Sequence, residues 1–72
     1  MPLTDKEMIN RFSYHPPKEG QPERYDHLRQ RAMEFACIVD MQCPDSREKA
    51  LALTKIEEAM MWANAAIARN EI

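Results

Sequence analysis

Two apolar seams with the same spacing, one in each half of the chain, constrain its fold more than any other feature. Within each seam the residues recur alternately three and four positions apart. This alternation predicts a helix with one apolar face, and two such helices joined by the four residues 43–46 must return antiparallel. We therefore predict an all-α fold built on an antiparallel helical hairpin. The seams consist of Tyr25, Leu28, Ala32, Phe35 and Val39, and of Leu53, Ile56, Met60, Ala63 and Ile67.

Residues that favour helix starts and ends delimit the two long helices. Pro22 suits the first position of the second helix, which we expect to end near Gln42 because Pro44 follows. Asp45 and Glu48 lie three residues apart and fit a capping box, which predicts the start of the third helix. The turn between the two helices is therefore expected to be short.

A short helix and a proline-rich loop precede the hairpin. Thr4 and Glu7 fit another capping box, which predicts a helix over about residues 5–11. Two adjacent prolines then favour extended backbone, and Gly20, the only glycine of the chain, allows a turn. We expect residues 1–72 to form a single domain with the order helix, loop and hairpin.

Both long helices carry more apolar residues than one seam requires. A hairpin buries one stripe per helix, so a second stripe must face another surface. A chain of 72 residues is also short for a self-sufficient core, and small domains compensate with disulfides, metals or oligomerisation. We therefore expect a homo-oligomer. The additional apolar residues are Met33, Cys37, Ile38 and Met41 in the second helix, and Leu51, Met61, Trp62, Ala65 and Ala66 in the third.

The cysteines and histidines do not predict a cross-link or a metal site. Cys37 and Cys43 lie six residues apart on one predicted helix. That spacing puts them about 9 Å apart along the axis and on different faces, too far for a disulfide, so we expect two buried free thiols. His15 and His27 are twelve residues apart, and no Cys/His cluster has zinc spacing. We expect neither a metal nor a cofactor.

The overall charge argues against a DNA or RNA polymer as the partner. Ten basic residues stand against twelve acidic ones, a formal charge of −2, whereas general nucleic-acid binders are usually basic. Residues 11–31 differ, with five basic residues against three acidic ones, which favours a local anion site. No segment is long and apolar enough to span a membrane, and the N-terminus lacks a signal-peptide pattern. We expect a cytoplasmic protein that does not bind membranes.

The loop Phe12–Gly20 holds the strongest candidates for ligand binding. Phe12 and Tyr14 flank a single residue, so in extended backbone both rings point to the same side. Two rings on one side form a platform on which a base can stack. The alternative is that they pack as a lid over the open end of the hairpin. His15 follows directly and has no histidine or cysteine neighbour in the sequence.

Arginines are expected to converge on this loop. Arg24 and Arg29 lie on the second helix, and Arg69 lies near the end of the third, which in an antiparallel hairpin is beside the start of the second. Guanidinium groups bind phosphate bidentately, although ordinary surface charge is the alternative for each arginine. The chain has no glycine-rich phosphate loop, HExxH or GxSxG motif. The sequence therefore favours a binding protein over an enzyme.

Two blocks of the sequence resemble a known family. FSYHPPKEGQPERY at 12–25 and CPDSREKALALTKIEEAMMWANAAIARN at 43–70 resemble the phage helical-hairpin sponges. These are the anti-CBASS and anti-Thoeris proteins, which sequester the cyclic nucleotide signals of bacterial immunity. The chain looks more like the anti-CBASS branch, because a short helix precedes its hairpin where the anti-Thoeris branch has a β-domain.

The resemblance implies a homohexamer that holds cyclic dinucleotides, such as cyclic GMP–AMP, between protomers in the cytoplasm of the infected bacterial host. It also implies separate sites for cyclic trinucleotides, and ligands that are held and not cleaved. It matches Tyr14 and Arg29 to the dinucleotide pocket. Their expected place at the open end adds four further candidates: Phe12, His15, Arg24 and Arg69. Two alternatives remain, a helical protein-interaction module and a sponge for a cyclic ADP-ribose signal.

Overall fold

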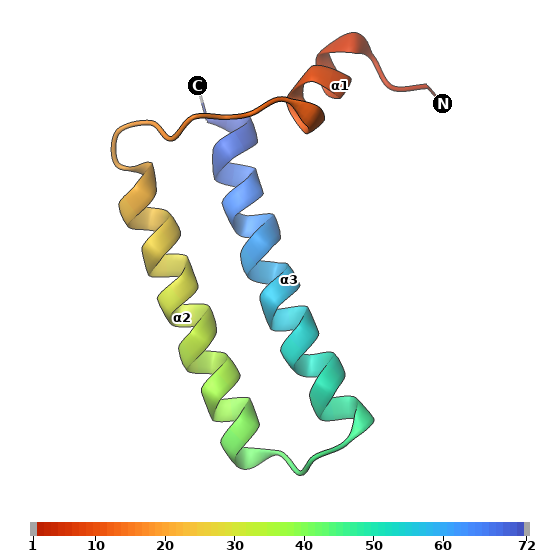
Figure 1. Cartoon of the computed structure of the whole chain (residues 1–72), viewed down its shortest axis with the longest axis vertical. Coiled ribbons are helices and arrows are strands. Elements are labelled where there is room, and N and C mark those ends of the chain that lie inside the picture. The colour runs from red at the N-terminus through yellow and green to blue at the C-terminus, as the bar shows by residue number, and fades with distance from the viewer. Residues whose placement is uncertain (1, 72) are drawn as a thin grey trace.

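The chain folds into a short helix followed by an antiparallel helical hairpin. The computed structural model describes residues 2–71, and this part of the chain contains three helices and no strand. Helix α1 spans Asp5–Phe12, α2 spans Gln21–Gln42 and α3 spans Arg47–Asn70. Helices α2 and α3 lie side by side, and α1 projects beyond the open end of the hairpin, where α2 begins and α3 ends (Figure 1). The predicted all-α hairpin is confirmed.

The predicted capping box begins α1. The hydroxyl of Thr4 accepts a hydrogen bond from the Glu7 backbone N–H at 3.1 Å, and the Glu7 carboxylate accepts one from the Thr4 N–H at 3.2 Å. The helix ends at Phe12, one residue later than predicted, and Ser13 is already extended. Phe12 is therefore the last residue of a helix, and the prediction that it belongs to the extended loop is wrong.

Gly20 sets the direction in which α2 leaves the loop. Its φ of 81° lies in the left-handed region, which a residue with a Cβ adopts only at a cost. Gln21 is the first residue of α2, so Pro22 occupies the second position and not the predicted first. A proline costs no hydrogen bond there either, because the first four N–H groups of a helix have no intrahelical partner.

The start of α3 differs from the predicted capping box. Ser46, and not Asp45, is the N-cap, and its Oγ accepts a hydrogen bond from the Lys49 N–H at 3.1 Å. Asp45 pairs instead with the Lys49 ammonium group at 2.9 Å, which also lies 3.1 Å from Asp40 of α2. Lys49 thereby connects the end of α2, the turn and the first turn of α3.

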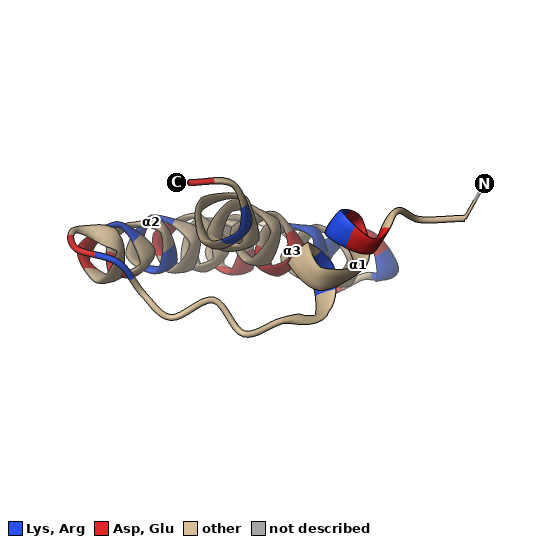
Figure 2. Ribbon diagram, turned by 90° about the horizontal axis from the view of Figure 1, so that it is seen from above, with Lys and Arg blue, Asp and Glu red and all other residues tan. Residues whose placement is uncertain are grey.

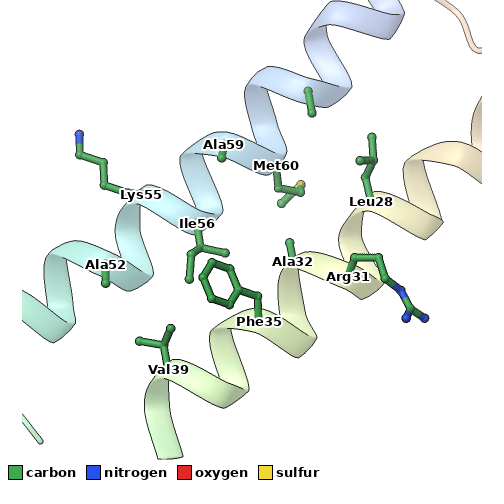
Figure 3. Close-up of a pocket in the computed structure, with 11 residues that line it drawn as sticks. Leu28, Arg31, Ala32, Phe35, Val39, Ala52, Lys55, Ile56, Ala59 and Met60 are labelled. Atoms are coloured by element: carbon green, nitrogen blue, oxygen red, sulfur yellow. The ribbon is translucent and has the colours of Figure 1, made fainter. Parts of the chain in front are cut away.

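The two seams face each other but do not form a closed core. Nine of the ten seam residues are half-buried, and Phe35 is 56% exposed. No apolar side chain between residues 2 and 71 is fully buried. An apolar groove of about 650 Å³ runs between the middles of α2 and α3, with Phe35 and Ile56 inside it and the charged ends of Arg31 and Lys55 turned away (Figure 3).

The shape explains why the groove stays open. The described chain measures 46 × 34 × 13 Å, and its shortest dimension is close to the diameter of one helix. Figure 2 shows the hairpin from its open end as a single layer of helices with both signs of charge along it. Domains usually enclose a core between at least two layers, so both faces of this hairpin remain uncovered in one chain.

The cysteines illustrate the same point. Cys37 and Cys43 are free, as expected, but both are exposed, so the prediction of buried thiols is wrong for the single chain. No second layer covers that part of the hairpin within residues 2–71.

Among residues 2–71, no helix combines the length and the apolar character needed to cross a membrane.

Candidate functional site

A cleft at the open end of the hairpin brings together side chains from all three helices and from the loop between α1 and α2. Its volume is about 340 Å³, at the lower end of the range usual for small-molecule sites. The loop between α1 and α2 passes this end of the hairpin and supplies one wall, and α2 and α3 supply the others (Figure 1). The cleft is lined by Arg11, Ser13, Tyr14, His15, Tyr25, Arg29, Asn64, Ala65, Ala68 and Arg69.

Two tyrosines give the cleft its aromatic walls. Tyr14 follows the extended Ser13, and its side chain is 81% exposed. Tyr25 of α2 is half-buried, and its hydroxyl donates a hydrogen bond to the side-chain oxygen of Gln21 at 3.3 Å. One ring is therefore held in place and the other is open to a ligand. Aromatic faces at such positions stack on nucleobases regardless of base identity.

His15 is oriented by the end of α1. Its Nε2 lies 2.7 Å from the backbone oxygen of Asn10. A carbonyl oxygen can only accept, so Nε2 carries the proton and donates it to this bond. In the neutral ring Nδ1 is then left as an acceptor. The half-buried ring lines the cleft as the sequence predicts, and it also borders a second, more polar hollow beside α1.

Three arginines from three different helices line the cleft: Arg11, Arg29 and Arg69. Arg29 contacts Asp26 at 3.4 Å, but both side chains are well exposed and such a pair contributes little. Arg11 and Arg69 form no ion pair with any residue from 2 to 71. The cleft therefore holds guanidinium groups that are available to an anion.

Arg24 lies outside the cleft and is already paired. Its guanidinium donates to the carboxylate of Glu71, which follows the end of α3. The Arg24 hydrogen bond, with a second one from Gln21, lowers the pKa of Glu71 to about 2. The same contact raises the pKa of Arg24. The topology led us to expect Arg69 near Arg24. The structure places Arg69 with Arg29 in the lining of the cleft, to which Arg24 does not contribute.

Phe12 also lies outside the cleft. It is 77% exposed, and as the last residue of α1 it does not line the cleft with Tyr14. The predicted candidates thus divide into two groups. Tyr14, His15, Arg29 and Arg69 share the cleft, whereas Phe12 and Arg24 do not.

Four polar residues of the cleft, Ser13 among them, were not among the predicted site residues. Tyr25 was assigned to the seam, and the position of Arg11 depends on where the loop turns. Asn64 interrupts an apolar stretch of α3, which is a visible signal in the sequence. Its Oδ1 is buried without a hydrogen-bond partner in the described chain, while its Nδ2 approaches the Met60 sulfur at 3.3 Å.

The larger groove between α2 and α3 is a different kind of surface. Apolar side chains dominate it, and its two cationic residues, Arg31 and Lys55, turn their charges away (Figure 3). Arg31 is also paired with Glu34 at 3.0 Å. This groove therefore suits an apolar partner surface, whereas the smaller cleft at the open end suits an aromatic anion.

The fold defines a helical-hairpin protein, and the cleft at its open end is its candidate ligand site. Residues 5–68 match the family model described as the Acb2/Tad1 hairpin domain, so the chain belongs to that family. This is the anti-CBASS and anti-Thoeris sponge family, whose members bind cyclic nucleotide messengers, and the chain is accordingly a sponge-type anti-defence protein. No curated protein and no solved structure gives a significant match. The resemblance seen in the sequence is confirmed.

Proposed function

We propose that this chain sequesters cyclic dinucleotides such as cyclic GMP–AMP and thereby blocks CBASS signalling. The observation that carries the proposal is the meeting of Arg11, Arg29 and Arg69 with the Tyr14 ring at one cleft. A cyclic dinucleotide presents two flat bases and two anionic phosphodiesters. Stacking on tyrosine and bidentate contact with guanidinium match both chemical features, so a protein of net charge −2 can still bind this anion.

The proposal includes a homo-oligomer, six-membered as the resemblance implies. A cleft of about 340 Å³ encloses only part of a ligand of two nucleotides, so a second copy would complete the site. The uncovered faces of the 13 Å layer support assembly as well. Cyclic trinucleotides are proposed as further ligands of the same assembly. DNA and RNA polymers are not proposed as ligands, and the setting is the cytoplasm of the infected host.

The proposal also states that the ligand is held and not cleaved. Ser13 and His15 both line the cleft and would be the obvious pair for nucleophilic attack. However, the Nε2 of His15 is directed to the Asn10 carbonyl at 2.7 Å. No hydrogen bond joins Ser13 to the free Nδ1 of His15 among the described residues, which favours a ligand-contacting role for His15.

Isothermal titration calorimetry tests the proposal with cyclic GMP–AMP, a cyclic tri-adenylate and cyclic ADP-ribose as separate ligands. We expect binding of cyclic GMP–AMP, and recovery of the intact nucleotide by chromatography after heat denaturation of the protein. Arg29→Ala should weaken binding by about ten- to a hundred-fold, because a hydrogen bond to a charged group contributes about 1.5–3 kcal/mol. Arg47→Ala removes the same charge at the opposite end of the hairpin and serves as the control.

The three ligands distinguish the proposed function from its two alternatives. If cyclic ADP-ribose alone binds, the chain is a sponge for that signal and not for cyclic dinucleotides. No heat with any of them at micromolar protein would contradict a sponge and favour a helical interaction module that contacts its partner through the loop, for which the exposed Tyr14 ring is the supporting feature. In that case Tyr14→Ala and Arg29→Ala would abolish binding to a protein partner instead.

A further inference from the structure

Gln21 is the only buried residue between residues 2 and 71, with 3% of its surface exposed. Its Oε1 accepts hydrogen bonds from the Lys18 backbone N–H at 2.8 Å and from the Tyr25 hydroxyl at 3.3 Å. Its Nε2 donates to the Glu71 carboxylate at 2.9 Å. One amide therefore connects the loop, the first turns of α2 and the end of α3. A buried amide is tolerated when its polar atoms are satisfied in this way.

Glu71 completes this arrangement from the other side. Its carboxylate also pairs with Arg24, and its backbone oxygen accepts a hydrogen bond from the Lys18 ammonium group at 2.9 Å. We call these four residues the Glu71 cluster: Lys18, Gln21, Arg24 and Glu71. The low pKa of the Glu71 carboxyl, about 2, keeps the cluster charged at neutral pH. Hydrogen bonds with an ionised partner are among the stronger ones in proteins.

The cluster does not line the cleft, yet it touches three of the segments that do: the loop, α2 and the end of α3. Lys18 belongs to the loop that carries Tyr14, Gln21 holds the Tyr25 hydroxyl, and Glu71 lies two residues after Arg69. Tyr14 itself has little to hold it, since its side chain is 81% exposed. The position of the cleft walls relative to one another therefore depends on contacts outside the cleft.

We infer that Glu71 is a positioning residue for the cleft, and that Arg24 serves the Glu71 cluster and not the ligand. The inference rests on the proposed function, because it concerns the affinity of the same cleft. A loop that is ordered before the ligand arrives spares the ligand the cost of ordering it. Loss of the cluster should thus weaken binding without removing a ligand contact.

A double-mutant cycle on cyclic GMP–AMP affinity tests this assignment. Arg24→Ala and Glu71→Ala should each weaken binding by about ten-fold, and the double variant should bind no more weakly than either single variant, since both remove the same cluster. Arg29→Ala combined with Glu71→Ala should bind more weakly than Glu71→Ala alone, because the two substitutions remove independent contributions to affinity. If the Arg24 and Glu71 effects multiply instead, Arg24 contacts the ligand and the inference is overturned.

The salt dependence of binding distinguishes a residue that contacts the ligand from one that only holds the cleft in place. The Arg24→Ala/Glu71→Ala pair leaves the net charge unchanged, so affinity should fall with added salt as steeply as in the unmodified protein. Arg29→Ala should flatten this dependence because it removes a charge that faces the ligand. A flattened dependence in the double variant would also overturn the assignment of Arg24.

Hydrogen exchange in the ligand-free protein tests the Glu71 cluster without any ligand. It therefore distinguishes failure of this inference from failure of the proposed function. Amides of residues 14–20 should exchange about three-fold faster or more in Glu71→Ala, because local opening becomes easier. Glu19→Gln removes one negative charge from the loop itself. Because Glu19 forms no side-chain hydrogen bond or ion pair in the described chain, this control should change neither exchange nor affinity. Unchanged exchange in Glu71→Ala, or faster exchange with undiminished affinity, overturns the inference. Absence of binding by the unmodified protein would overturn the proposed function itself.

Discussion

At the scale of single residues, the partners of each arginine decide its role. Arg24 and Arg31 are both paired with a glutamate, at Glu71 and Glu34 respectively. Arg69 forms no ion pair within residues 2–71, and it projects into the cleft from the last turn of α3. A cation near a helix C-terminus is favoured by the helix dipole, so the fold tolerates Arg69 there without a carboxylate partner.

Tyr14 should contribute to affinity through its ring and not through its hydroxyl. Tyr14→Ala is expected to weaken cyclic GMP–AMP binding by about five- to a hundred-fold, because stacking of one base contributes about 1–3 kcal/mol. Tyr14→Phe keeps the ring and should stay within about two-fold of the unmodified protein. Calorimetry measures both. Equal affinity in Tyr14→Ala would show that the exposed ring does not face the ligand.

The Glu71 carboxyl should make stability depend on pH in acid. Its pKa is about 2 in the folded chain against 4.5 as the ordinary value, so the unfolded chain binds the proton more readily. The contribution is complete above pH 4.5 and is lost as the pH falls through about 2. Thermal unfolding followed by circular dichroism should therefore show a smaller acid-induced decrease in Tm for Glu71→Gln than for the unmodified protein. Parallel decreases in both proteins would contradict the pairing with Arg24.

Residue-level expectations can be drawn from sequence where topology decides, but not where a distant partner decides. Arg69 could be expected at the open end because an antiparallel return brings the start of α2 beside the end of α3, whereas Arg29 was singled out by the family resemblance. The role of Arg24 could not, since Glu71 lies 47 residues away and nothing in the spacing identifies it. Phe12 was assigned to the loop although it is the last residue of α1. Its place depends on where the helix ends, and helix ends are defined only to within a residue or two.

At the scale of elements, the seams were predictable because helical periodicity is a local property. Each seam repeats through a stretch without internal proline or glycine, so a single pattern defines the whole helix. The cap of α3 was less predictable. Asp45 and Ser46 are adjacent and both favour the N-cap position. The extended backbone of Ser46 puts its own hydroxyl within reach of the Lys49 N–H, and Asp45 forms an ion pair instead.

The cap assignment predicts a difference between two adjacent alanine variants. Ser46→Ala should lower the free energy of unfolding by about 1 kcal/mol, because a helix N–H loses its acceptor. Ser46→Asp keeps an acceptor there and should cost only a few tenths of that. Asp45→Ala removes only an exposed contact and should cost less than Ser46→Ala. Urea unfolding measures all three, and a larger loss in Asp45→Ala would move the cap back to Asp45.

At the scale of the whole molecule, the hairpin is a layer without a second layer. The excess of apolar residues in both helices is enough to predict this, because one seam per helix is all that a hairpin can bury. What the sequence could not predict is where the surplus lies. The structure places it on exposed positions such as Met33, Met41 and Trp62, whereas the open groove between the helices is lined mainly by seam residues.

The proposed homo-oligomer makes stability depend on protein concentration. A chain without a closed core should gain most of its stability on assembly, so Tm should rise by about 3–8 °C for each ten-fold increase in concentration. Phe35→Asp separates this from the behaviour of a monomer. In a single chain this side chain is 56% exposed, and the substitution would cost little. If another copy covers it, the buried charge should prevent assembly, with a lower mass by light scattering and a loss of helical circular dichroism. A Tm that stays constant over a hundred-fold range of concentration, with an unchanged mass in Phe35→Asp, would contradict assembly through this groove.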